Sequence, residues 1–339
     1  MKATLNVAVV GAGLYGRVHL SAYRQHPRVR VLYVCDLDEE RARQAAAAVG
    51  ARATARYAEI AADPQVDAVS VTTPDFAHAE IVTAMLEAGK HVLVEKPLAT
   101  DVAEARAMVA AAQASGRHLM VDFQNRWNPP LVAAKQRIES GAFGTPVMAS
   151  ARLANTLFVP REMLAWAGRS GPQWFLLPHL ADLVCWLFDR RAVRGTAAGR
   201  KGVLAAMGGD AYDAIQALVE FDDCSATLET AWILPDSFPR VVDFSALLLG
   251  TRERIALSPT EPLIEVSGSR HEWPAVGALQ EIHGVTYGWQ LLPILHFVDC
   301  LLAGETPQCT AAEGFHNTAL IGAIEQSLAS GTPTLIERL

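Results

Sequence analysis

A strand pattern that runs directly into a glycine motif constrains the fold of this chain more than any other feature. Leu5–Val10 is an apolar run that predicts a buried strand, and a helical pattern extends through Ala22. Between them, Gly11, Gly13 and Gly16 have the spacing G-x-G-x-x-G. The first glycine suits a tight turn, the second lets the backbone approach a pyrophosphate, and the third lets helix and strand pack closely. The segment therefore predicts a strand–turn–helix unit that binds dinucleotide phosphates at the helix N-terminus.

A second apolar strand ends in an acidic residue at the position expected for ribose recognition. Val29–Cys35 is followed by Asp36, twenty residues after Gly16, where a carboxylate accepts hydrogen bonds from ribose hydroxyls. Because a carboxylate repels a 2′-phosphate, the residue favours NAD over NADP without excluding NADP. Leu14 and Tyr15, inside the glycine motif, complete the cofactor-binding residues predicted for this loop.

Strands and helices continue to alternate as far as residue 123. The predicted strands are 66–71, 92–97 and 118–123, and the predicted helices are 39–49, 79–88 and 102–115. Alternation with short links predicts a parallel, doubly wound sheet with helices on both faces.

The strand 92–97 ends in Glu95, Lys96 and Pro97. Pro97 has no N–H group, so the strand stops there and the charged pair lies at the carboxyl edge of the sheet, where open parallel sheets bind ligands. A lysine in this position could donate or accept a proton, because burial and neighbouring charges readily shift its pKa. A solvated lysine at a strand end is the alternative, and this segment alone favours the alternative.

Three further residues follow the strand 66–71 at the same edge. Thr73 and Pro74 begin a turn, and His78 starts the next helix. His78 could approach a nicotinamide ring, but local hydrogen bonding at the helix start explains the histidine equally well.

These segments together resemble the Gfo/Idh/MocA family of NAD(P)-dependent oxidoreductases, which includes glucose–fructose oxidoreductase and inositol dehydrogenase. The resemblance covers the whole first domain and is carried by G-A-G-L-Y-G, Asp36, Thr73-Pro74-x-x-x-His78 and, above all, the Glu-Lys-Pro motif at residues 95–97. It implies that Lys96 touches the reacting hydroxyl group and that Glu95 lies near both cofactor and lysine. The resemblance thereby reverses the preference for a solvated lysine.

The composition changes after Phe123, and the chain is expected to divide there. Residues 1–123 form the predicted dinucleotide-binding Rossmann domain, and residues 124–339 form a predicted α+β domain for substrate binding and oligomerisation. Its largely antiparallel open sheet is predicted from strands at 147–153, 215–221, 226–233, 241–249 and 252–257. The predicted helices are 131–140, 178–188, 289–303 and 311–329.

The helix 178–188 carries the strongest candidates of the second domain. His179, Asp182 and Trp186 fall on one helix face. A histidine is suited to moving a proton at neutral pH, and a carboxylate one turn away could orient its ring. A structural His–Asp pair is the alternative. The family resemblance places His179 at the family's histidine and Asp182 at the following aspartate, whereas Phe175 replaces the family's first aspartate. This replacement suggests a shorter proton relay, a less polar substrate or a protein without catalysis.

Four more residues are candidates for binding a polyol or sugar. Asn125 and Arg126 belong to a segment that resembles the start of the family's substrate domain, and both could donate hydrogen bonds to hydroxyl groups. Asn155 and Trp174 offer an amide and an aromatic face in the stretch before the helix 178–188. Capping, interdomain pairing and packing are the alternative roles.

Composition limits the partners of this chain. A net charge of −7 disfavours nucleic acid, and no apolar run is long enough to span a bilayer. The five cysteines are scattered without a C-x-x-C pair, which is typical of reduced residues in a cytoplasmic protein. No His/Cys group has metal-ligand spacing, so no metal is predicted. The family resemblance implies a homodimer or homotetramer.

The leading hypothesis is therefore an NAD(P)-dependent oxidoreductase that transfers a hydride between the nicotinamide and a secondary alcohol or ketone of a sugar, sugar derivative or cyclitol. Lys96 and His179 are the expected catalytic residues. A non-catalytic sensor that binds NAD(P) and a sugar is the first alternative, motivated by Phe175. An NAD-dependent glycoside hydrolase is the second.

Overall fold

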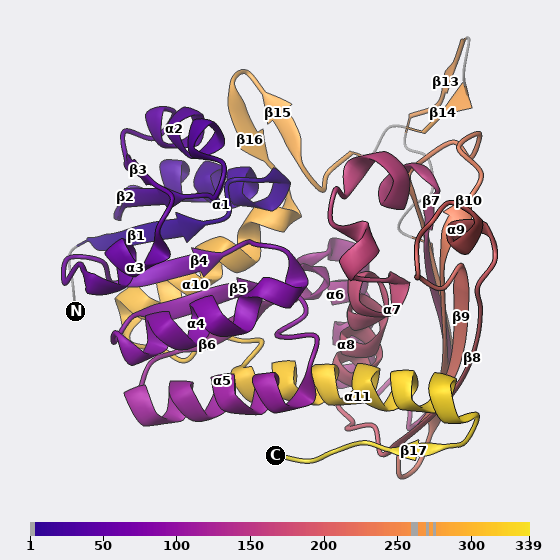
Figure 1. Ribbon diagram of the computed structural model, residues 1–339. Coiled ribbons are helices and arrows are strands. Elements are labelled where there is room, and N and C mark those ends of the chain that lie inside the picture. Colours follow the sequence, from indigo (N-terminus) through magenta and orange to yellow (C-terminus); the bar gives the residue numbers. More distant parts are fainter. Residues whose placement is uncertain (1–3, 259–263, 269–270, 274–275) are drawn as a thin grey trace. The chain divides into compact units, whose positions relative to one another are not determined.

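The computed structural model describes residues 4–258, 264–268, 271–273 and 276–339 of the chain (Figure 1). They form two compact units. The first unit comprises Met1–Gln124, Ala278–Phe315 and Leu339, and the second comprises Asn125–Gly277 and His316–Arg338. No helix among the described residues is long and apolar enough to cross a membrane.

Six parallel strands form the sheet of the first unit, in the order β3-β2-β1-β4-β5-β6. The order reverses between β1 and β4, and ligands of doubly wound sheets bind at the carboxyl ends of the strands beside such a switch point. The predicted parallel sheet is confirmed. Its strands are β1 Leu5–Val10, β2 Val29–Cys35, β3 Arg52–Thr54, β4 Ala68–Val71, β5 His91–Glu95 and β6 Leu119–Asp122.

Helices cover the first sheet because their apolar faces pack against its buried strands. Val9, Val69 and Leu93 illustrate the strand core, since none of them is accessible to solvent. The helical segments of this unit are α1 Leu14–Gln25, α2 Glu39–Ala47, α3 Tyr57–Ala62, η1 Asp75–Ala77, α4 His78–Glu87, α5 Val102–Ser115, η5 Trp289–Leu291 and α10 Leu292–Ala303.

The segment Ala278–Phe315 belongs to the first unit although it follows most of the second unit in sequence. Its helix α10 packs against α1 and β6, with Ile294 and Phe297 fully buried. A division at one point of the chain therefore does not describe the compact units. A small hairpin, β15 Gln280–Ile282 and β16 Val285–Tyr287, belongs to the same segment.

The second unit contains a seven-stranded sheet in the order β12-β11-β7-β10-β9-β8-β17. The pair β10–β7 is parallel and the other pairs are antiparallel, so the largely antiparallel sheet expected from the sequence is confirmed. Its strands are β7 Pro146–Thr156, β8 Arg194–Arg200, β9 Ala214–Glu220, β10 Ser225–Leu234, β11 Val242–Gly250, β12 Arg254–Leu257 and β17 Thr334–Leu335. A separate short pair joins β13 Val266–Ser267 to β14 His271–Glu272.

Helices α7 and α8 pack against one face of this sheet, on β7, β9 and β10. Leu180, Leu183 and Leu187 of α8 are fully buried there, as expected for an apolar helix stripe. The helical segments of the unit are η2 Gln124–Trp127, α6 Pro129–Glu139, η3 Val159–Met163, η4 Ala167–Arg169, α7 Pro172–Phe175, α8 Leu177–Phe188, α9 Val203–Ala206 and α11 Ala311–Ser330. The first residue of η2 and the first five of α11 are assigned to the first unit.

Several elements have no signal in the sequence. The strand β8 has the composition RGTAAGR, yet it pairs with β9 along its full length, from Arg194 opposite Glu220 to Arg200 opposite Ala214. Its extended state is therefore set by its partner and not by β-propensity. The short elements β3, α3, α9, β17 and the hairpin strands were also not predicted.

Candidate active site

The three motif glycines serve two different purposes. Gly11 has φ of +100°, and a Cβ there would lie 2.6 Å from the carbonyl oxygen of Thr72. A Cβ at Gly16 would lie 1.9 Å from the carbonyl oxygen of Gly11. A Cβ at Gly13, in contrast, would meet nothing within 4 Å. The outer glycines are thus required by the fold, and Gly13 borders open space at the start of α1, which fits a bound pyrophosphate.

Asp36 follows β2 and is tied to the glycine loop. Its Oδ2 accepts a hydrogen bond of 2.7 Å from the backbone of Ala12, and its Oδ1 accepts one of 2.9 Å from Asp38. The guanidinium of Arg41 lies 3.5 Å from Oδ1 and is half-exposed. The carboxylate is therefore held beside the loop that would carry the phosphates. A carboxylate at this place fits the ribose hydroxyls of NAD, and Arg41 lies beside it.

The two middle residues of the motif differ. Leu14 is 66% exposed at the start of α1. Tyr15 is half-buried, and Gln124 Nε2 donates a 3.5 Å hydrogen bond to its hydroxyl oxygen. Burial, together with the charge of Glu95, raises the pKa of the Tyr15 hydroxyl to about 12. Tyr15 therefore stays neutral near physiological pH and offers a hydrogen bond next to the Glu95 region.

His78 is fully buried and joins two loops at the sheet edge. Its Nδ1 lies 2.8 Å from the carbonyl oxygen of Pro97, and its Nε2 lies 3.0 Å from that of Thr73. A neutral imidazole donates only one of these hydrogen bonds at a time, and burial lowers the pKa of His78. The contact with Thr73 is the kind of local bonding that the sequence analysis named as an alternative, and the contact with Pro97 is long-range. These hydrogen bonds hold the Thr73–Pro74 turn against the end of β5, so His78 has a supporting role in the structure of the site.

Lys96 lies where the sequence predicts, directly after β5, and only 7% of it is exposed. Burial lowers the pKa of Lys96, and the carboxylates of Glu95, Asp75 and Asp122 act in the opposite direction. Glu95 and Asp122 are opposite each other in the β5–β6 register. A buried lysine at a ligand-binding edge can exist as the neutral amine that proton abstraction requires.

Two buried residues near Lys96, His19 and Asp122, were not predicted from the sequence. His19 of α1 is inaccessible to solvent, and its Nε2 lies 3.3 Å from Glu95 Oε1 and 3.5 Å from Asp122 Oδ2. Its Nδ1 lies 2.9 Å from Ser70 Oγ. Two signals could have found them. Asp122 ends an apolar strand at the same edge as Glu95, and His19 follows Gly16 by three residues on the sheet side of the helix.

The ligand atoms of His19, Glu95 and Asp122 lie within 4.8 Å of one another, a spacing that could hold a metal ion. The imidazole already bonds both carboxylates. Hydrogen bonding accounts for the group without a metal.

In the second unit, Asp182 pairs with Arg126. Arg126 Nη2 and Nε donate to the two carboxylate oxygens of Asp182 at 2.6 and 3.0 Å, and both side chains are buried. Such a bidentate pair fixes the start of the unit to α8. His179 is half-buried in the first turn of the same helix, whose Pro178 carbonyl accepts a 2.9 Å hydrogen bond from Asn317. Asn125 caps its own turn, since its carbonyl accepts from the backbone of Asn128.

Phe175, which replaces the acidic residue of the family pattern, belongs to an aromatic cluster. Its ring centroid lies 5.9 Å from that of Trp166 and 5.6 Å from that of Trp232. The indole N–H of the neighbouring Trp174 donates a 2.8 Å hydrogen bond to Glu325. Its polar group is therefore already used within the unit.

Asn155 has polar capacity to spare. Its Nδ2 donates a 3.3 Å hydrogen bond to the carbonyl oxygen of Val241. Within the described residues, its buried Oδ1 and the buried Nε1 of Trp232 have no hydrogen-bond partner. The two residues follow the β7–β10 pair Ala154–Ala231 by one position each. Buried polar atoms of this kind are unusual and suit a place that a ligand completes.

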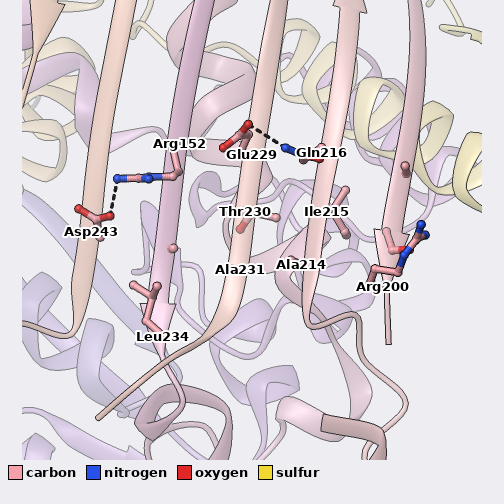
Figure 2. A pocket seen from close by; sticks show the side chains of 13 residues that line it. Arg152, Arg200, Ala214, Ile215, Gln216, Glu229, Thr230, Ala231, Leu234 and Asp243 are labelled. Carbon is pink, nitrogen blue, oxygen red and sulfur yellow. Dashed lines mark hydrogen bonds and ion pairs between the residues drawn. The ribbon is translucent and has the colours of Figure 1, made fainter. Parts of the chain in front are cut away.

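Two cavities open on the sheet face opposite α7 and α8. One, of about 320 Å³, contains Arg152 bonded to Asp243 and Gln216 bonded to Glu229 (Figure 2). The other, of about 570 Å³, extends across Ser245 and neighbouring residues. None of the site residues predicted from the sequence lines either cavity. This face is therefore distinct from the candidate active site.

Comparisons with known proteins agree with this geometry. Residues 5–123 match an "oxidoreductase family, NAD-binding Rossmann fold", and residues 131–256 match a "GFO/IDH/MocA C-terminal domain". The chain is 30% identical to inositol 2-dehydrogenase 1 of Saccharopolyspora erythraea, over 98% of this chain and 97% of that protein. It is 27% identical to D-apiose dehydrogenase of Paraburkholderia graminis, over 98% and 90% of the two chains.

Solved structures add the cofactor. The crystal structure of GenD2 from gentamicin A biosynthesis, in complex with NAD, is 25% identical to this chain. It superimposes with a TM-score of 0.84 over 99% of this chain and 97% of that one. The first domain of the present chain is accordingly an NAD-binding Rossmann domain.

Proposed function

The chain belongs to the Gfo/Idh/MocA family of oxidoreductases, and on this premise we propose that it transfers a hydride between NAD and a secondary alcohol or ketone of a sugar, sugar derivative or cyclitol. The observation that carries the proposal is buried Lys96 at the carboxyl end of β5, in an NAD-binding domain. The relatives named above, an inositol dehydrogenase and an apiose dehydrogenase, support a polyol or sugar as the substrate class.

Lys96 is the proposed general base for alcohol oxidation. Burial favours its neutral amine, which accepts the hydroxyl proton as the C–H bond of the same carbon breaks. NAD, when bound, takes up the hydride, and Gly11, Gly13, Asp36 and Thr73 are the proposed holders of the cofactor. In the reverse direction the Lys96 ammonium returns the proton to the ketone oxygen. A positioned base of this kind contributes roughly 10²–10⁴-fold to the rate.

The second unit is proposed to supply His179 and Asn155 for proton transfer and substrate binding. The spare hydrogen-bond capacity of Asn155 supports its role. Arg126 and Asp182 are already paired with each other, so we assign them to holding α8 in place. The aromatic cluster around Phe175 supports a substrate with an apolar face, such as a pyranose or cyclitol ring.

We also propose that the chain forms a homodimer or homotetramer through the open face of its second sheet. Met148, Leu218 and Leu249 are each 38–42% exposed there, on the sheet face that carries the two cavities. A cytoplasmic location is proposed from the five cysteines, all of which are free. Light scattering of wild type and Leu218→Glu tests the assembly, and an unchanged mass for the variant would contradict this interface.

The test of the activity begins with thermal unfolding in the presence of NAD, NADH, NADP or NADPH, alone and with a panel of sugars, sugar acids and inositols. Binding to the native state raises the apparent melting temperature. We expect NAD(H) to stabilise the protein and one polyol to add to the effect. Turnover with that polyol should then fall by about 10²–10⁴-fold in Lys96→Met, with cofactor affinity unchanged.

The same assay separates the alternatives. Stabilisation by NAD and a polyol without formation of reduced nicotinamide would favour a sensor. Release of an aryl leaving group without net reduction of NAD would favour a glycoside hydrolase. Wild-type turnover in Lys96→Met would contradict the role of the lysine.

A further inference from the structure

We propose that His19 is a positioning residue that governs the proton affinity of Lys96, by competing with its ammonium for the carboxylates of Glu95 and Asp122. The inference rests on the proposed role of Lys96 as the general base. His19 lies on the helix that follows the glycine motif, and nothing in the proposed hydride transfer requires a buried imidazole at that point.

The geometry first defines the protons of His19. Its Nε2 faces two carboxylates, at 3.3 Å from Glu95 Oε1 and 3.5 Å from Asp122 Oδ2. A bare nitrogen lone pair facing two carboxylates would be repelled, so Nε2 carries a proton. Its Nδ1 lies 2.9 Å from Ser70 Oγ, which also bonds the hydroxyl of Tyr23. The Ser70 hydroxyl can accept a proton from Nδ1 as well as donate one, so the geometry accommodates an imidazolium.

The electrostatics agree with this assignment. Burial alone disfavours the imidazolium, but the hydrogen bonds and charges of Asp122 and Glu95 outweigh burial and raise the pKa of His19 to about 9. Burial also raises the pKa of Asp122 to about 6, although its hydrogen bond to His19 acts in the opposite direction. Near neutral pH the cluster therefore contains a positive His19 between two carboxylates.

Lys96 depends on the same carboxylates. Burial acts to remove its proton, and Glu95, Asp75 and Asp122 act to retain it. Two of these three carboxylates are the partners of His19. The positive imidazole therefore weakens the hold of Glu95 and Asp122 on the lysine proton and favours the neutral amine.

Other ionisable groups around the cluster do not replace His19. Burial keeps the hydroxyls of Tyr15 and Tyr23 protonated by raising their pKa, and it keeps His78 neutral by lowering its pKa. The titratable and charged groups that face Lys96 and His19 come from α1, η1, α4, β5 and β6: Tyr15, Tyr23, Asp75, His78, Glu95 and Asp122. Among the described groups named here, His19 is the one cation besides Lys96 itself that lies beside Glu95 and Asp122.

The branch of the cluster through Ser70 does not lead protons to solvent, because it ends at Tyr23, which is 1% exposed. Asp122 Oδ1 is buried without a hydrogen-bond partner among the described residues. The carboxylate can therefore interact more with His19 or more with Lys96 without breaking a hydrogen bond at Oδ1.

The test compares two variants whose effects have opposite signs. In a plot of kcat for polyol oxidation against pH, kcat should rise as Lys96 loses its proton, and this rising part of the curve is called the limb. In His19→Gln a positive charge is lost and Lys96 holds its proton more tightly. The limb should therefore move to higher pH by about one unit. In Asp122→Asn a negative charge is lost, and the limb should move down by a similar amount. His316→Gln in the second unit should leave the limb in place.

The proposal would be overturned if the limb lay at the same pH in all variants, or if His19→Gln and Asp122→Asn moved it in the same direction. A merely structural role does not predict that the two variants move the limb in opposite directions. These outcomes differ from failure of the proposed function, in which Lys96→Met retains wild-type turnover. If the limb does not report on Lys96, the inference loses its premise and is rejected with it.

A second measurement needs neither activity nor a variant. Nitrogen-15 spectra of the ten imidazoles in the wild-type protein at pH 8 should show one ring protonated on both nitrogens. A protein in which every imidazole is neutral at pH 8 would overturn the proposal. His19→Asn gives an additional kinetic variant if His19→Gln fails to fold.

Discussion

The two units bury charge in different ways. In the second unit, Arg126 and Asp182 form a closed pair, in which two donors meet two acceptors at 2.6 and 3.0 Å. In the first unit, one imidazole is shared between two carboxylates at 3.3 and 3.5 Å, and Lys96 interacts with the same carboxylates. A closed pair has one stable arrangement and suits a structural role. An open cluster can gain or lose a proton at small cost, and this property suits a catalytic edge.

The largest expected effect comes from opening the closed pair. Asp182→Leu leaves the Arg126 guanidinium buried without its carboxylate and should lower the free energy of unfolding by about 3–5 kcal/mol. Denaturant titration would measure the change. The double variant Arg126→Met with Asp182→Leu should recover most of the loss. The control is Arg43→Ala, which breaks an exposed ion pair between Arg43 and Glu40. Its N–O distance of 2.7 Å is similar to those of the buried pair, but the change in the free energy of unfolding should be less than about 0.5 kcal/mol.

The next effect concerns the open cluster at alkaline pH. The pKa of His19 is raised to about 9 in the folded state, above the value of an unfolded histidine. Its stabilising contribution is therefore complete below about pH 6.5 and is lost as the pH rises through 9, by about 3 kcal/mol in total. Unfolding free energies between pH 6 and 10 should fall more steeply for the wild type than for His19→Gln. Parallel curves would contradict the assignment of charge to His19.

His316 should show the opposite dependence in the second unit. Burial lowers its pKa to about 4, with Arg191 and Arg338 acting in the same direction. Between pH 6.5 and 4 the unfolded state binds a proton that the folded state does not bind, so stability falls as the pH falls, by about 3 kcal/mol. His316→Gln keeps an acceptor for the N–H of Ala192, which now bonds Nε2 at 3.1 Å. The variant should therefore flatten this acid slope, whereas an unchanged slope would exclude His316 as its source.

The smallest effect is expected at Asp36, a carboxylate that already accepts two backbone hydrogen bonds. Asp36→Ser should weaken NADH binding by about tenfold, equivalent to about 1.4 kcal/mol, because it removes a charged acceptor for the ribose hydroxyls. NADPH should lose less affinity, since the repulsion of its 2′-phosphate also disappears. Fluorescence titration would measure both affinities. An equal loss for both nucleotides would show that Asp36 acts only through the loop.

The first sheet illustrates how much of the fold the sequence could predict. Strands Leu5–Val10 and Val29–Cys35 and the helix Val102–Ser115 were predicted with the bounds that they have in the structure. Their signals are local, since each depends on an apolar run, a glycine or an aspartate cap within the segment. The strand β8 was not predicted, because pairing with β9, and not its own composition, makes this segment extended.

The candidate site residues show the same difference between local signals and long-range contacts. Gly11, Gly16 and Lys96 lie where the motif spacing predicts, since a motif reports the local backbone. The predicted role of Asp182 in orienting His179 stays a prediction, and the structure adds a partner for Asp182 that the sequence did not indicate, Arg126, 56 residues earlier. Trp174 stays a predicted substrate contact, and the structure adds a hydrogen bond from its indole to Glu325, 151 residues later. Long-range partners of this kind leave no spacing signal in one sequence.

By itself, the sequence determined the NAD-binding architecture, the family and the position of Lys96, because these depend on residues that are close together along the chain. Only the tertiary structure decided which charges share a carboxylate. His19, Glu95 and Asp122 come from α1, β5 and β6, and they meet because the parallel sheet brings the ends of β5 and β6 side by side beneath the helix. The protonation of such a cluster depends on burial and on distances of a few ångströms, and both are properties of the packed molecule.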